Sequence, residues 1–226
     1  GQIGTEQMSG VAIVNQLLFV FNICIFGGVS GAGIFSTQFF GKGDYEGQKH
    51  AFRFKMYASL TIGVIALCLF GFCSTQLISL YLNDTGNVGD IGLALKFGKQ
   101  YLFIMMASLL PFAVSQTYIS TIRETGQTFV PMLASVVAVL TNLVLDYVLI
   151  FGLWEIPALG VQGAAIATVI ARVIECIIVV TWTHTHKEKN PYIVGAYASP
   201  RIPKQICKDI LRKGTPLMFN EMFWAA

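Results

Sequence analysis

Charged residues are scarce in this chain of 226 residues. Asp, Glu, Lys and Arg together make up 12% of it, whereas a soluble domain usually carries about 25%. Hydrophobic residues make up 54%, and the mean hydropathy is +0.65. The few charges lie in short strips between long apolar runs. This pattern excludes an ordinary soluble domain and indicates a polytopic helical membrane protein.

Cysteine and histidine are also scarce, which excludes several kinds of site. The five cysteines are scattered and mostly inside apolar runs, without the paired spacing of a zinc site or a disulfide framework. There is no HExxH motif, and no histidine lies in the interior of an apolar run. We therefore expect no enzyme active site, no resident metal, no cofactor and no nucleic-acid partner.

Five apolar runs are long enough to cross a bilayer, and a sixth begins near the end of the chain. Roughly 20 apolar residues span the hydrocarbon core, and helices are the default because open strands leave backbone groups unsatisfied in lipid. The runs are approximately 10–40, 54–82, 94–122, 130–151 and 161–183, with the sixth starting at Pro216. The expected fold is therefore all-α, a bundle of transmembrane helices.

Basic residues lie on alternate connections between the runs. The connections 41–55, 123–128 and 185–214 hold twelve lysines and arginines, whereas only Lys96 and Lys99 lie near the others. Because basic residues favour the cytoplasmic side, we expect these connections to be cytoplasmic loops of a multi-pass protein in the cell (inner) membrane. The long connection 185–214 is also the one large shift in composition. It separates a first unit, 1–184, from the start of a second, 215–226.

One carboxylate lies inside an apolar run. Asp146 is the only charge between Val130 and Gly152, and placing it in lipid costs about 2.5–3.5 kcal/mol on insertion scales. Asn142 lies one helical turn earlier and therefore on the same face. An acid and an amide that point at one spot from a membrane helix indicate a cation or proton site.

Four stretches of the chain carry a family resemblance. They read GVSGAGIFSTQFFGKGDYE, TYISTIRETGQTFVPM, NLVLDYVLIFG followed by LGVQGAAIATVIARVIE, and GTPLMFNEMFW. Together and in this order they resemble the multidrug and toxic compound extrusion (MATE) family of cation-coupled exporters. The resemblance implies twelve helices in two six-helix lobes, of which this chain supplies helices two to six and the start of seven. Helix one, with an acidic residue that many members use in the cation site, is then missing.

The resemblance and helix geometry together outline the site. Asp146 and Asn142 match the family's acid and amide on helix five. Thr168 is expected at their level, because Asp146 lies about 8 Å and Thr168 about 10 Å from the outer ends of their helices. Gln116 is the nearest amide on helix four, where many members place an asparagine one turn later, at Ile119 here. Such oxygens suit sodium, but the acid could instead carry a proton, so the coupling ion stays open.

Four more polar residues are secondary candidates. Arg172 and Glu175, three apart on one helix, are interpreted as a neutralising pair that makes burial tolerable, with a role in gating as the alternative. Asn220 and Glu221 begin the other lobe and are candidates for the central cavity of the transporter.

A secondary active exporter is the leading interpretation. By the resemblance, two lobes would alternate between inward- and outward-open states while sodium or a proton drives antiport of small amphipathic, often cationic, compounds. The full-length protein is expected to be monomeric. A lipid-linked sugar flippase of the same wider superfamily is an alternative, but it would need several basic residues in its cavity, and only Arg172 lies inside a run. A passive channel is a further alternative, although the chain has no repeated filter sequence.

Overall fold

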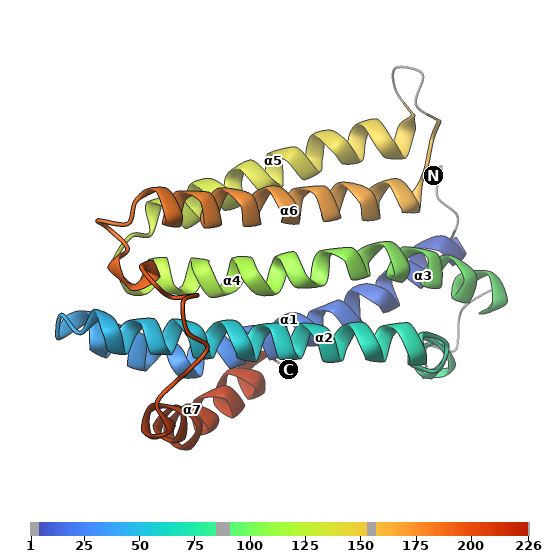
Figure 1. Cartoon of the computed structure of the whole chain (residues 1–226). Helices are drawn as coiled ribbons and strands as arrows, with labels where there is room; N and C mark the ends of the chain where they lie inside the picture. The colour runs from blue at the N-terminus through green and yellow to red at the C-terminus, as the bar shows by residue number, and fades with distance from the viewer. Residues whose placement is uncertain (1–4, 85–90, 153–156, 226) are drawn as a thin grey trace. The chain divides into compact units, whose positions relative to one another are not determined.

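The computed structural model describes residues 5–84, 91–152 and 157–225, with side chains over 7–80, 91–152 and 157–216. All regular structure in these ranges is helical, which confirms the expected all-α fold (Figure 1). Among the described residues, five stretches are long and apolar enough to cross a membrane: Gln7–Gly41, Tyr45–Leu80, Ile91–Glu124, Phe129–Phe151 and Val161–Thr185. Each corresponds to one of the five predicted runs.

The helices begin and end close to the edges of these runs. In chain order they are α1 (Thr5–Gly41), α2 (Tyr45–Asp84), α3 (Ile91–Met105), η1 (Met106–Ser108), α4 (Leu109–Glu124), α5 (Phe129–Phe151), α6 (Val161–Thr185), η2 (Pro191–Ile193) and α7 (Lys204–Ala225). The start of α2 is capped by Asp44, whose Oδ1 accepts a hydrogen bond from the Gly47 backbone N–H at 2.8 Å.

Three boundaries differ from the prediction. The run 94–122 is divided by η1, because Pro111 has no N–H to donate to the Ala107 carbonyl and the chain tightens ahead of it. Residues 45–55, predicted as part of a loop, form the first turns of α2. The start of α7 at Lys204 lies before the predicted start of the second lobe, since hydropathy detects only the apolar end of a helix whose first turns are polar.

The chain divides into two compact units, and several helices contribute residues to both. Unit 1 comprises Gly1–Phe21, Val64–Pro111 and Val136–Ile174, and unit 2 comprises Asn22–Gly63, Phe112–Ser135 and Glu175–Ala226. Unit 1 thus contains parts of α1, α2, α5 and α6 together with the whole of α3. Its core is made of apolar side chains from these helices, including Val14, Leu102 and Ala165.

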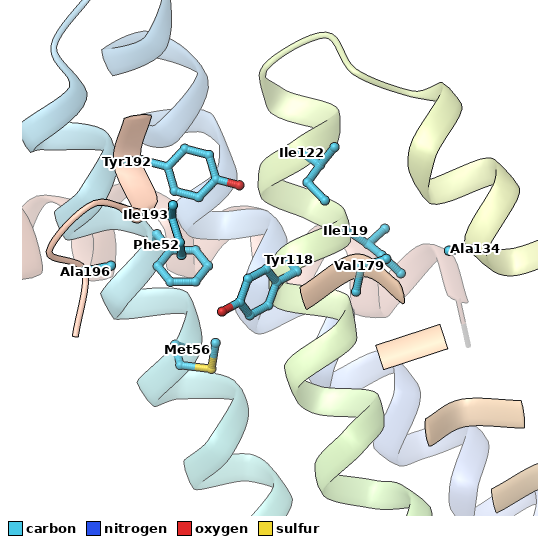
Figure 2. Packing of buried hydrophobic residues seen from close by; sticks show 10 residues of the cluster. All are labelled: Phe52, Met56, Tyr118, Ile119, Ile122, Ala134, Val179, Tyr192, Ile193 and Ala196. Atoms are coloured by element: carbon cyan, nitrogen blue, oxygen red, sulfur yellow. The ribbon is translucent and has the colours of Figure 1, made fainter. Parts of the chain in front are cut away.

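Unit 2 has a core in which aromatic rings meet (Figure 2). Phe52 of α2 packs edge-on against Tyr118 of α4, with ring centroids 5.2 Å apart, and lies 5.5 Å from the ring of Tyr192 in η2. Apolar side chains of α4, α5 and α6 complete the cluster, among them Ile122, Ala134 and Val179. The connection that follows α6 is therefore packed into the core of this unit.

Arg53 fixes the same connection to α2. This residue is 7% exposed, and its guanidinium donates to the carbonyls of Ala196 at 2.6 Å, Gly195 at 2.8 Å and Arg201 at 3.2 Å. The planar fork of arginine suits several acceptors at once. The sequence places Arg53 among the charges of the predicted cytoplasmic loop 41–55. In the structure it is buried and anchors the connection that follows α6.

Candidate ion-binding site

Within unit 1, α5 and α6 approach each other closely at Gly163. A Cβ at this position would lie 2.7 Å from the Leu149 carbonyl oxygen, nearer than real Cβ atoms come, so only glycine permits the approach. The Leu159 backbone N–H donates to the same carbonyl at 2.9 Å. The close contact allows short polar side chains on the two helices to reach each other.

Asp146 and Asn142 of α5 lie beside Thr168 of α6. In one orientation of its amide, Asn142 donates from Nδ2 to Asp146 Oδ2 at 3.2 Å and accepts from the Thr168 backbone N–H at 3.2 Å. In the other orientation, Nδ2 donates to the Thr168 hydroxyl at 3.4 Å. That hydroxyl donates to the Ala164 carbonyl at 3.0 Å, which leaves its oxygen free to accept. Three of the four residues predicted to share a site are therefore neighbours.

One carboxylate oxygen of Asp146 has no hydrogen-bond partner in the described part of the chain. Oδ1 is buried and receives no hydrogen bond from the residues that the structure describes. An unpaired charged oxygen away from water is unfavourable, and a proton or a cation at this oxygen would remove that cost. The cluster offers a negative charge with amide and hydroxyl oxygens, the ligand set that hard cations such as sodium prefer.

Unit 1 also holds a polar contact between α3 and α1 that was not predicted from the sequence. Tyr101 of α3 is buried, and its hydroxyl donates to Asn15 Oδ1 of α1 at 3.3 Å. The available signal was weak, because a lone tyrosine or asparagine in an apolar run does not show which neighbouring helix it faces.

The fourth predicted ligand, Gln116, belongs to unit 2. It lines a pocket of about 530 Å³ between α1 and α4, together with Phe26, Ile34 and Arg123. No group of three or more His, Cys, Asp or Glu side chains that could hold a metal occurs in the described part of the chain.

The secondary candidates fall in both units, Arg172 in unit 1 and the other three in unit 2. Glu175 is buried in unit 2, where its Oε1 accepts a hydrogen bond from the Ser135 hydroxyl at 2.8 Å. Its pairing with the half-buried Arg172 stays a prediction. Asn220 and Glu221 lie on the last turns of α7, and their side chains are outside the described residues.

A buried ion pair in unit 2 was also missed. Lys55 donates from Nζ to Glu124 Oε2 at 2.6 Å, and their side chains are 0% and 12% exposed. Ser120 donates to Glu124 Oε1 at 2.6 Å, so both carboxylate oxygens are satisfied. From the sequence, Lys55 is expected in a cytoplasmic loop, and no role is predicted for Glu124. The two residues are 69 positions apart, and only the packing of α2 on α4 brings them together.

These features define the class of protein. Membrane-length helices that hold an acid, an amide and hydroxyl groups among their apolar side chains make a multi-pass membrane protein with a polar site inside its helices. The MatE family model matches residues 1–148, and the chain belongs to this family.

Curated relatives agree with this assignment. The chain is 27% identical over 216 residues to the probable multidrug resistance protein NorM of Thermotoga maritima, covering 96% of this chain and 44% of that protein. It is 28% identical to the multidrug export protein MepA of Staphylococcus saprophyticus, covering 82% of this chain and 38% of MepA. The chain thus spans less than half the length of these relatives.

Solved structures show the same fold. A crystal structure of a MATE protein in complex with MaD3S superposes with a TM-score of 0.81, at 22% identity, over 97% of this chain and 46% of that one. An inward-facing multidrug resistance MATE family transporter gives a TM-score of 0.79, also at 22% identity, over 98% and 48% of the two chains. At this identity the likeness establishes the fold alone.

Proposed function

We propose that the full-length protein exports small amphipathic compounds in exchange for a cation, and that Asp146, Asn142 and Thr168 bind the coupling ion. The observation that carries the proposal is the buried Oδ1 of Asp146, which has no partner among the described residues, on a carboxylate whose neighbour Asn142 also contacts Thr168. The names of the relatives, a multidrug resistance protein and a multidrug export protein, support the substrate class.

Coupling requires the ion to bind one state of the transporter more tightly than the other. An ion shifts a conformational equilibrium only by its differential affinity for the two states. In the proposed cycle, a cation or proton that enters from outside neutralises Asp146 and favours the state that takes up substrate next. Release of the ion on the inner side restores the charge, and the ion gradient thereby drives export.

Sodium and a proton make different demands on the same oxygens. Sodium needs several oxygen ligands together, whereas a proton needs only the carboxylate. Efflux from proteoliposomes of full-length protein, under an imposed sodium gradient or an imposed proton gradient, separates the two. Efflux that responds to neither gradient would remove the basis for antiport.

The sugar flippase is the weaker candidate. Pyrophosphate recognition needs several basic groups that are free to bind it. Lys55 is engaged by Glu124, and Arg53 by three backbone carbonyls, so neither offers its charge to such a ligand.

The decisive variant is Asp146→Asn in the full-length protein. The change removes charge and titration with almost no change of volume, so we expect normal expression and loss of gradient-driven dye efflux. Glu188→Gln, which neutralises an exposed carboxylate in the connection after α6, is the matched control and should behave as the unmodified protein. Normal gradient-driven efflux by Asp146→Asn would refute the proposed mechanism.

A further inference from the structure

The first half of α7 has two chemically different faces. Ile206, Ile210 and Gly214, which are four apart, lie on one face, and the last two of them are buried. A Cβ on Gly214 would lie 2.9 Å from the Gly31 carbonyl oxygen, so the backbones of α7 and α1 are in contact within unit 2. This contact keeps the helix against α1, which crosses the membrane.

The other face presents a row of cations. Lys204, Lys208 and Arg212 are also four apart, and all three are exposed. Leu211 lies on the same side of the helix and is 54% exposed, although it is a large apolar residue. Asp209 is the only acidic residue between positions 201 and 216. It follows Lys208 directly in the sequence and is therefore not a member of the row.

We propose that this face of α7, formed by Lys204, Lys208, Leu211 and Arg212, binds anionic phospholipid headgroups of the adjacent leaflet. Basic residues around an exposed apolar side chain are the composition of helices that lie at a membrane surface. The cations attract the phosphates, and the leucine enters the boundary between headgroups and acyl chains. An acidic protein surface would complement the cations but would give no reason for an exposed leucine among them.

The expected effect is large enough to measure. Each lysine or arginine near an anionic surface contributes about 1 kcal/mol, which corresponds to roughly fivefold in affinity. The variant Lys204→Gln/Lys208→Gln/Arg212→Gln should therefore weaken binding of phosphatidylglycerol on the order of 100-fold, while binding of phosphatidylcholine stays unchanged. Titration of purified full-length protein with each lipid, followed by native mass spectrometry, measures both.

A control variant distinguishes the effect of this row of cations from the effect of lowering the net charge of the protein. Lys42→Gln/Lys187→Gln/Lys189→Gln removes the same charge from three other exposed lysines that form no such row. It should retain the phosphatidylglycerol affinity of the unmodified protein. An equal loss in this control, or no loss in the α7 variant, overturns the proposal.

A second measurement tests what covers the face. An environment-sensitive fluorophore on Leu211→Cys, in full-length protein without its native cysteines, should shift to the blue in nanodiscs that contain phosphatidylglycerol. In nanodiscs of phosphatidylcholine alone, its emission should stay at the wavelength typical of a water-exposed fluorophore. A blue-shifted signal in both lipids would mean that protein covers the face and would overturn the proposal. Because this readout needs no transport, it is independent of the proposed function.

Discussion

Asp146 is one member of a small polar cluster on α5 and α6. The carboxylate shares a hydrogen bond with Asn142, which in turn meets Thr168 on the neighbouring helix. Thr168 therefore gives the sharpest residue-scale test, because its hydroxyl can be removed almost without change of shape.

We expect Thr168→Val to weaken ion binding and Thr168→Ser to preserve it. Valine fills the same space without an oxygen, whereas serine keeps one. A neutral ligand oxygen contributes about 1 kcal/mol, so the ion concentration that gives half-maximal efflux should rise roughly fivefold in the valine variant. Equal behaviour of the two variants would show that the threonine only bonds back to the Ala164 carbonyl.

A second prediction at the residue scale concerns the ion pair between Lys55 and Glu124. Lys55→Met leaves a buried carboxylate without its cation, which should cost about 3–5 kcal/mol of stability and lower the Tm of the protein in detergent. Adding Glu124→Gln should recover most of the loss, because the second charge then disappears too. Glu46→Gln removes an exposed partner of Lys49 and should leave the Tm unchanged. A Tm in Lys55→Met equal to that of the unmodified protein would contradict the buried pair.

At the scale of the helices, the distance between α5 and α6 determines whether the cluster can exist. Gly163 sets this distance, since a Cβ there would meet the Leu149 carbonyl oxygen at 2.7 Å. The side chains of Asn142 and Thr168 are short, so even a small separation of the helices breaks their contact.

Gly163→Ala should therefore damage ion coupling without touching a ligand. The extra methyl forces α5 and α6 apart, at a cost of about 1–3 kcal/mol, and we expect ion-driven efflux to fall at least about tenfold. Gly71→Ala in α2 is the matched control, because its Cβ would meet only the Met106 side chain, at an ordinary 3.7 Å. If both alanine variants transport equally well, the close approach is not needed for the site.

At the scale of the whole molecule, the distribution of charge predicts an orientation in the membrane. The connections with most lysines and arginines follow α1, α4 and α6, and the positive-inside rule places them in the cytoplasm. The connection between α5 and α6 should then lie on the outside.

Single cysteines in full-length protein without its native cysteines test this orientation. A membrane-impermeant maleimide should label Ala158→Cys, between α5 and α6, in intact cells. It should label Lys187→Cys, after α6, only in inside-out vesicles. Both positions are exposed, so access to the reagent depends on the side of the membrane alone. The opposite labelling pattern would reverse the predicted orientation.

Much of the fold could be read from the sequence because hydropathy is a local property. Each apolar run must satisfy its own backbone groups in lipid, so its residues form a helix whatever its neighbours are. The lone Asp146 and the amide one turn before it were visible for the same reason, since both lie on one helix. The ends of elements were less accurate where polar turns precede the apolar part, as in α2 and α7.

The tertiary structure decided which polar groups meet across helices. Tyr101 reaches Asn15, Lys55 reaches Glu124 and Arg53 reaches Ala196, in pairs separated by 86, 69 and 143 positions. Such contacts depend on how each helix is rotated about its axis and on how closely its neighbours approach. The sequence of a single apolar run specifies neither of these. The sequence by itself thus determined the helices and the charge they hold in the membrane, whereas packing determined which polar groups lie near that charge.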